Sequence, residues 1–268
     1  MLGLGSYTFR WSAGHKGVTP DQPMTHVAML DVASEHGLGL IQFADNIPIE
    51  RLDSAGLHDL NSKARSLGIA IELGTQAFKL EEMQRYIGFA EFLNAKILRV
   101  ALDGPDAEIP VPQLAKSFLD LKSRAMNAGV RIAVENHFNY PATRLAQLME
   151  EIDDPFVGVC LDVANSICAG EWPMETVRTL APYTINLHLK DYDIVPDPYG
   201  VGFAIHGTPL GQGRTDCGAV LAALPKGQKI NVILEHWLPK SDDLAKDCAD
   251  EHVWLGKSLK FAREALHL

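Results

Sequence analysis

The sequence predicts a (β/α)8 TIM barrel, an α/β fold, as a single domain that spans residues 1–268. Short β-rich runs alternate with longer helix-period runs from one end of the chain to the other. Strands that alternate with helices favour a parallel sheet. Eight such units fit into 268 residues without a break in composition, and that size and rhythm are typical of the barrel.

Each predicted strand is a short apolar run that is followed by an amphipathic helical pattern. In chain order the strand and helix pairs are 2–9 with 25–37, 38–44 with 52–66, 68–75 with 79–93, 95–102 with 111–128, 131–137 with 143–152, 156–165 with 173–181, 184–192 with 216–224, and 230–237 with 242–265.

Capping residues mark several of these boundaries. N-caps are expected at Thr25, Asp53, Thr143 and Asp216, because short polar side chains there precede helical patterns. Gly37, Gly68 and Gly129 stand where a helix ends and the next strand begins.

A doubly wound open sheet is the alternative fold. It would prefer a glycine-rich phosphate-binding turn after the first strand, and "GLGSYT" at 3–8 lacks that fingerprint. The barrel is therefore favoured. The segment 193–215 is too long for an ordinary connection and is rich in glycine and proline. It is interpreted as a functional loop on the catalytic face.

Composition excludes several partners. The net charge is −10, with 24 basic and 34 acidic residues and no basic cluster, so a nucleic-acid partner is not expected. The four cysteines form no CxxC pair, which favours reduced thiols in a cytoplasmic protein. No targeting segment or membrane-spanning apolar run is found, so no membrane partner is expected.

Side-chain parity places four ionisable residues in the barrel lumen. In strands five to eight one set of alternating positions is uniformly aliphatic, for example Ile185, Leu187 and Leu189 in the seventh, and this set is assigned to the helix-facing side. The opposite set then points inward and ends, near the C-terminal end of each strand, in an ionisable side chain. These side chains are Glu135, Asp162, His188 and Glu235.

Three carboxylates and an imidazole in one small volume repel each other unless a cation bridges them. A divalent metal ion resolves this conflict, and the mixed oxygen and nitrogen set suits Mn²⁺, Mg²⁺, Co²⁺ or Zn²⁺. The alternative is a network of salt bridges with Arg99 and Lys190 as counter-ions. That network would leave Glu135, Asp162 and Glu235 short of cations.

The remaining inward-facing polar and aromatic residues are candidate substrate contacts. Arg99 or Arg214 could bind a substrate carboxylate, although Arg99 is also expected to form an ion pair with Glu72. Lys190 could pair with a carboxylate or polarise a carbonyl, and His137 lies at the rim. The full set is Tyr7, Gln42, Arg99, His137, Lys190, Arg214 and Trp237.

The C-terminal half resembles the xylose-isomerase-like barrel superfamily of sugar isomerases and epimerases. The matching segments lie on or beside strands five to eight: "VENH" (134–137), "GVCLDVAN" (158–165), "LHLKD" (187–191), "GTPLGQGRTD" (207–216) and "ILEHW" (233–237). The N-terminal half is similar in its strand and helix rhythm only.

This resemblance implies that Glu135, Asp162, His188 and Glu235 bind one divalent ion and that Glu135 and Glu235 are the catalytic acid/base pair. The ion would hold the substrate oxygens and stabilise an enediolate while the glutamates move protons. The family often forms dimers or tetramers. The sequence lacks two features of the epimerase branch: a second glutamate just after Glu135 and an arginine shortly after His188.

The predicted function is a metal-dependent isomerase or epimerase of a small keto-sugar or oxo sugar acid. Decarboxylation of a 3-oxo sugar acid is the alternative, because loss of CO₂ beside a carbonyl leaves the same enediolate. A keto-polyol dehydratase is a third possibility. The acidic charge and the single histidine ligand argue against an abasic-site endonuclease, and a non-catalytic sugar-binding barrel would not need these ligands.

Overall fold

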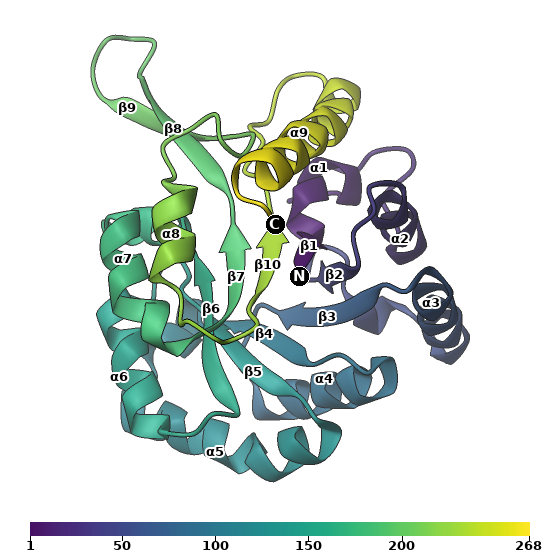
Figure 1. Cartoon of the computed structure of the whole chain (residues 1–268), viewed down its shortest axis with the longest axis vertical. Helices are drawn as coiled ribbons and strands as arrows, with labels where there is room; N and C mark the ends of the chain where they lie inside the picture. The colour runs from purple at the N-terminus through teal and green to yellow at the C-terminus, as the bar shows by residue number, and fades with distance from the viewer.

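The computed structural model describes all 268 residues. Eight parallel strands form a closed barrel (Figure 1), which confirms the predicted fold. The strands are β1 (Leu2–Gly5), β2 (Leu40–Phe43), β3 (Ala70–Thr75), β4 (Ile97–Ala101), β5 (Arg131–Glu135), β6 (Val157–Asp162), β7 (Thr184–Leu189) and β10 (Asn231–Leu234). Their order around the barrel follows the chain, and β10 closes it by pairing with β1 and β7.

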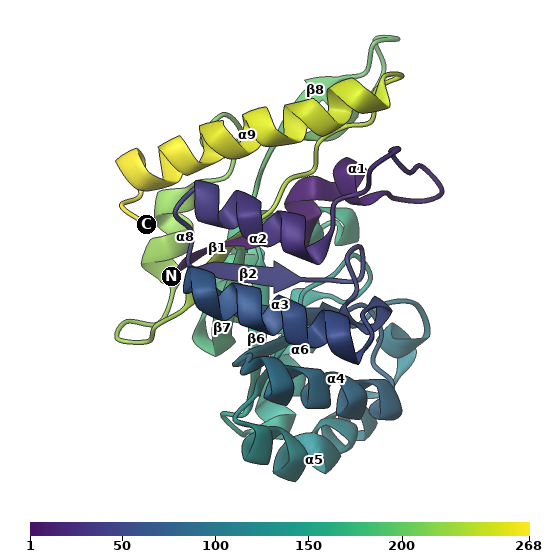
Figure 2. The ribbon, with the colours of Figure 1, turned by 90° about the vertical axis from the view of Figure 1, so that its right-hand side faces the viewer.

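Helices surround the barrel, and Figure 2 shows α2, α3 and α4 stacked along one side. The helices that follow the barrel strands are α2 (His26–Glu35), α3 (Ser54–Leu67), α4 (Leu80–Leu93), α5 (Val111–Ala128), α6 (Ala142–Ile152), α7 (Pro173–Leu180), α8 (Cys217–Ala223) and α9 (Leu244–Ala265). The main hydrophobic core is a cluster of 60 buried residues. None of the helices has the length and apolarity needed to cross a membrane.

The capping predictions hold at three of four N-termini. The side chains of Thr25, Asp53 and Asp216 each accept a hydrogen bond from a backbone N–H in the first turn. The prediction for Thr143 is wrong, because α6 already begins at Ala142 after Pro141. The carboxylate of Glu171 accepts from the N–H of Ala142 at 3.1 Å and thereby replaces the missing cap.

The first strand is shorter than predicted. It ends at Gly5, and Ser6–Phe9 form a 3-10 helix, η1. Two hydroxyl groups of this turn fasten it to segments that are distant in the sequence. Ser6 donates to Asn46 at 2.5 Å, and Thr8 donates to the carbonyl of Leu234 at 2.8 Å.

The inward and outward alternation fails at one residue of β7. The register between β6 and β7 shifts at Val159 and Cys160, so that Ile185 is the extra residue of a bulge. Ile185 was predicted to face the helices. It instead packs in a small buried cluster with Ile97, Ala133 and Cys160. Ile185 fits there because residue 158 is a glycine. Any other residue would place its Cβ 2.5 Å from Ile185 Cγ2, which is too close.

The segment predicted as a long loop contains a hairpin that projects from the barrel (Figure 1). Its antiparallel strands are β8 (Asp191–Pro196) and β9 (Phe203–Thr208). Asp191 anchors the chain that follows the hairpin. One of its carboxylate oxygens accepts from the N–H groups of Gly211 and Gly213, and the other from that of Thr215, at 2.8–2.9 Å.

A short helix, α1 (Arg10–Ala13), is fastened to α9 by one buried carboxylate. Glu251 accepts hydrogen bonds from the N–H of Trp11 at 2.6 Å and from the N–H and hydroxyl of Ser12 at 2.9 and 2.6 Å. Burial raises the pKa of Glu251 from its ordinary 4.5 to about 7, although these hydrogen bonds oppose the shift.

This raised pKa predicts a pH-dependent effect of the Glu251→Gln substitution. The pKa of Glu251 is lower in the unfolded chain than in the folded protein. At pH values between the two, Glu251 keeps its proton in the folded protein and has lost it in the unfolded chain. The wild type therefore loses stability as pH rises through this window. Relative to the wild type, the variant should gain about 3 kcal/mol of unfolding free energy between about pH 4 and pH 8.

Urea unfolding of both proteins at several pH values measures this difference. Glu264→Gln, at an exposed position of the same helix, is the control. A wild-type-to-variant difference that stays constant with pH would contradict the assignment.

Candidate active site

A cavity of about 670 Å³ opens at the C-terminal ends of the barrel strands. Only 4 of its 23 lining residues are hydrophobic, so it suits a polar ligand. The walls come from the barrel strands and from the loops that follow them, including the segment after α1. This is the face on which barrel enzymes build their active sites.

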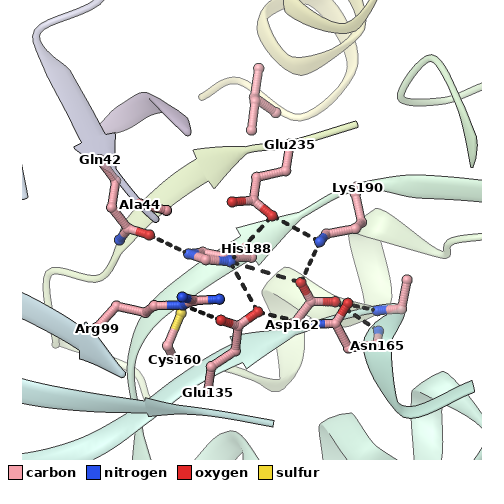
Figure 3. Close-up of polar contacts among 12 residues, drawn as sticks. Gln42, Ala44, Arg99, Glu135, Cys160, Asp162, Asn165, His188, Lys190 and Glu235 are labelled. Atoms are coloured by element: carbon pink, nitrogen blue, oxygen red, sulfur yellow. Dashed lines mark hydrogen bonds and ion pairs between the residues drawn. The ribbon is translucent and has the colours of Figure 1, made fainter. Parts of the chain in front are cut away.

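The four predicted ligands converge near the C-terminal ends of their strands (Figure 3), and two of them, Glu135 and Glu235, line the cavity. Glu135 ends β5, Asp162 ends β6, His188 lies in β7, and Glu235 follows β10 directly. All four are at most 5% exposed. Glu135, Asp162 and His188 each offer an atom within 4.8 Å of the other two, an arrangement that could hold a metal ion.

The distances around His188 fit one small cation. Its Nδ1 atom lies 3.5 Å from Glu135 Oε1, 3.5 Å from Glu235 Oε2 and 3.8 Å from Asp162 Oδ2, and it makes no hydrogen bond. Ligand atoms about 2.1 Å from a shared ion are separated by roughly 3.0–3.4 Å. Glu135, Asp162 and His188 are thus close to the spacing of a coordination shell, whereas Glu235 lies outside this group of three and would have to move toward the ion.

Although burial opposes the shift, Cys160, Glu235 and Glu135 raise the pKa of His188 well above its usual range. With His188 neutral, as a metal ligand is, the site is short by one cation. Three carboxylates share two neighbouring cations, since Arg99 pairs with Glu135, and Lys190 lies 2.6 Å from Asp162 and 2.8 Å from Glu235. Burial disfavours the ionised form of Glu135, but Arg99 and His188 outweigh it and lower its pKa well below the usual range. The pKa of Asp162 is instead raised by burial, which Lys190 only partly offsets. A divalent ion would supply the missing charge.

A chain of hydrogen bonds beneath the site orients the histidine. Gln42 donates its amide N–H to Glu72 at 3.0 Å, so its carbonyl oxygen faces His188 Nε2 at 2.7 Å and accepts from it. Glu72 is held in turn by Asn186 and Asn231 at 2.9 and 2.6 Å. With Nε2 occupied as a donor, Nδ1 is the nitrogen that faces the carboxylates and could bind a metal.

Replacing Gln42 by leucine should weaken metal binding by about 10- to 100-fold without removing a ligand. The physical reason is that His188 loses the partner that fixes its ring orientation and the proton on Nε2. Titration of the metal-free protein with Mn²⁺ measures the affinity. Gln113→Leu, on the exposed face of α5, is the control. An unchanged affinity in the Gln42 variant would show that the ring is held by other contacts.

Among the predicted substrate contacts, Tyr7, His137, Lys190 and Trp237 line the cavity. Tyr7 lies in η1 and donates to Asp45 at 2.9 Å. Trp237 follows β10, and its ring centroid is 5.3 Å from the Lys190 ammonium. His137 follows β5, with Nδ1 3.1 Å from Asp103 Oδ2.

The other predicted contacts are placed differently from expectation. Arg99 reaches the cavity but is bound to Glu135, and the predicted pair with Glu72 does not form because β3 and β4 align Arg99 with Gly74, one layer above Glu72. Gln42 lies below the cavity, beside His188. Arg214 is not among the lining residues, and it pairs with Asp193 at 2.7 Å.

Sequence reasoning missed several residues of the site. Asn165 donates to Glu135 Oε1 at 2.8 Å and lies within the quoted segment "GVCLDVAN", three residues after Asp162. Its position three residues after the predicted ligand Asp162 is the sequence feature that could have indicated a role in the site. Arg10, His15 and Lys16 line the outer cavity from a segment that has no strand or helix periodicity, so nothing in the sequence marked them.

A family model described as xylose isomerase-like TIM barrel matches residues 30–265. The chain is 29% identical over 261 residues to a 3-oxo-isoapionate decarboxylase of Pectobacterium atrosepticum, a match that covers 97% of this chain and 94% of the relative.

Solved structures show the same fold at lower identity. An IolI protein with a bound zinc atom is 18% identical with a TM-score of 0.73, over 98% of this chain and 96% of that one. A D-psicose 3-epimerase with D-tagatose, from Clostridium cellulolyticum, is 13% identical with a TM-score of 0.71, over 99% of both chains.

Proposed function

Because the chain belongs to the xylose isomerase-like TIM-barrel family, we propose that it is a divalent-metal-dependent decarboxylase of a small 3-oxo sugar acid. The members found beside it include sugar epimerases and a decarboxylase. The choice between these reactions depends on what the two glutamates of the site can do.

The pairing of both glutamates with cations is the observation that carries the proposal. Both carboxylate oxygens of Glu135 are engaged, one by Arg99 and the other by Asn165 at 2.8 Å. Glu235 is bound to Lys190, and His188 and Lys190 lower its pKa despite burial. Carboxylates held in this way are weak bases. Epimerisation needs a glutamate to remove a proton from carbon, whereas decarboxylation needs no such step.

The 3-oxo-isoapionate decarboxylase supports the same choice, since its similarity extends over nearly the whole chain. The sequence also lacks the additional glutamate and arginine of the epimerase branch near Glu135 and His188. The similarity to this relative favours a substrate with a carboxylate next to the carbon that reacts, and the missing residues argue against the epimerase branch.

The proposed reaction breaks one carbon–carbon bond and forms one carbon–hydrogen bond. The bond between the carboxylate and the carbon beside the ketone breaks, CO₂ leaves, and the electron pair moves toward the ketone oxygen. That carbon then takes one proton, which restores the ketone. We assign the proton to the Lys190 ammonium, which lines the cavity.

Glu135, Asp162, His188 and Glu235 would hold the metal ion, which supplies a positive charge that polarises the ketone oxygen. The donor set fits Mn²⁺, Mg²⁺, Co²⁺ or Zn²⁺. Arg99 keeps Glu135 ionised, and Gln42 keeps the free nitrogen of His188 directed at the carboxylates.

An isomerase or epimerase acting on a keto-sugar is the second candidate. It is favoured by the presence of Glu135 and Glu235 together on the cavity wall. It would require Glu235 to be free of both Lys190 and the metal ion, so that this glutamate could remove a proton from a bound keto-sugar.

Incubation of the metal-loaded protein in D₂O separates the two reactions. With a panel of 3-oxo sugar acids we expect release of CO₂ in equal amount to a product that carries one deuterium at the carbon that lost the carboxylate. With neutral keto-sugars we expect no deuterium exchange. Metal ions alone and the Glu135→Gln variant are the controls for spontaneous loss of CO₂. Deuterium exchange in keto-sugars without CO₂ release would overturn the decarboxylase in favour of the isomerase.

A further inference from the structure

The Lys190 ammonium lies between two predicted metal ligands, where it takes the place of the cation that those ligands would bind. The residue is 3% exposed, and its ammonium lies 2.6 Å from Asp162 Oδ2 and 2.8 Å from Glu235 Oε2. These are two of the four predicted ligands. Figure 3 shows the ammonium reaching across from the end of β7 to both carboxylates.

An ammonium and a divalent ion cannot share these two carboxylates without strong repulsion. Like charges a few ångströms apart in a buried site repel each other far more than they do in water. Lysine has a long flexible stem, so its head group can move while the backbone stays in place. The cavity lies beside it, and the Trp237 ring, 5.3 Å away, offers a surface that attracts a cation.

We propose that Lys190 competes with the metal ion for Asp162 and Glu235 and, once those two residues hold the ion, turns to bind the carboxylate of the substrate. In that position the lysine has left its two protein carboxylates and faces a water-filled cavity. A negatively charged substrate group is then the partner that restores its charge balance. This inference deepens the proposed function and rests on it for the substrate class, a sugar acid rather than a neutral sugar.

The other cations that line the cavity are less suited to this role, since Lys16 and Arg51 are exposed and touch none of the predicted ligands, while Arg99 and Arg10 already have partners. The guanidinium of Arg99 already donates hydrogen bonds to Glu135 and, at 3.2 Å, to the carbonyl of Thr75, and these bonds hold it in place. Arg10 lies in the outer wall and donates to His15 at 2.8 Å. Lys190 is the cation that contacts two predicted metal ligands and lines the cavity as well.

Metal affinity of the Lys190→Met variant is the first test. Methionine has a similar stem but no charge, so it no longer competes for the two carboxylates. Titration of the metal-free proteins with Mn²⁺ should show at least about tenfold tighter binding in the variant. Lys240→Met is the matched control, because Lys240 also pairs with a buried carboxylate, Asp247 at 2.9 Å, but lies outside the cavity.

Binding of a charged and an uncharged probe to the Mn²⁺-loaded proteins is the second test. D-Xylonate and xylitol have the same number of carbons and differ in the carboxylate. The variant should bind xylonate at least about tenfold more weakly than the wild type and xylitol equally well. Metal binding that is weaker or unchanged in Lys190→Met, or xylonate binding that is unchanged, would overturn the proposal.

The Lys190→Gln variant and circular dichroism of all proteins guard against a folding defect, since two folded variants without the charge should behave alike. Neither the metal titration nor the probe-binding measurement depends on catalytic turnover. If the D₂O panel shows isomerisation while both binding results hold, the decarboxylase proposal fails and the role of Lys190 stands. If CO₂ is released while the binding results fail, the reverse is true.

Discussion

Replacing Arg99 by methionine should destabilise the metal-free protein by about 3–5 kcal/mol. Arg99 is 4% exposed and is the cation bound to Glu135, and its guanidinium also lies 3.9 Å from Asp45. Removing it leaves a buried carboxylate without its partner. That cost is much larger than the gain from forming the pair, because the desolvation of Glu135 is no longer compensated.

A saturating divalent metal should reduce the difference between this variant and the wild type, because the ion would take over as the positive partner of Glu135. Urea unfolding with and without Mn²⁺ measures both effects. The matched control is Arg124→Met, whose exposed pair with Glu91 at 2.8 Å is worth at most about 1 kcal/mol. Equal losses in the two variants would contradict the buried-pair interpretation.

The double variant Glu135→Gln, Glu235→Gln should lose both the bound metal and the catalytic activity. Each substitution keeps the shape of the side chain and removes a negatively charged ligand. We expect a loss of metal affinity greater than the roughly 100-fold that follows from disturbing an outer-shell partner. Elemental analysis of the purified proteins and Mn²⁺ titration measure it.

Glu151→Gln, Glu264→Gln is the control pair, because both positions are exposed on outer helices. It should keep about one ion per chain and full turnover. Retention of a stoichiometric ion by the Glu135, Glu235 double variant would remove these residues from the metal site, whatever its activity.

The sequence allowed the barrel and much of its site to be predicted because strand side chains alternate with a period of two. Once the aliphatic set is assigned to the helix-facing side, Glu135, Asp162 and His188 must point into the lumen. The structure brings all three within 4.8 Å of one another. Glu235 lies just beyond its strand and still reaches 3.5 Å from His188, since the chain continues in the same direction.

Alternation does not reveal where a strand bulges or how high a residue lies in the barrel. The bulge at Ile185 turned a predicted helix-facing side chain inward. Glu72 and Arg99 both face the lumen, but the register between their strands places them in different layers. Register is set by contacts between strands that are distant in sequence, and the pattern within one strand does not contain it.

Loops limited the prediction in a different way. Arg10, His15 and Lys16 reach the cavity because Glu251, about 240 positions away in the sequence, holds Trp11 and Ser12. No local periodicity reports such a contact. The hairpin in place of the loop 193–215 was missed because its turn residues, rich in glycine and proline, conceal two short strands.

The neighbouring residues Lys190 and Asp191 connect the site to the chain segment that follows the β8–β9 hairpin. Lys190 points into the site, while Asp191 points the opposite way and holds Gly211, Gly213 and Thr215. A slip of one residue at this point would exchange the two side chains and place a fourth carboxylate among the ligands. We therefore expect an insertion or deletion at this dipeptide to disrupt the site, whereas the exposed hairpin tip at residues 198–203 should tolerate one.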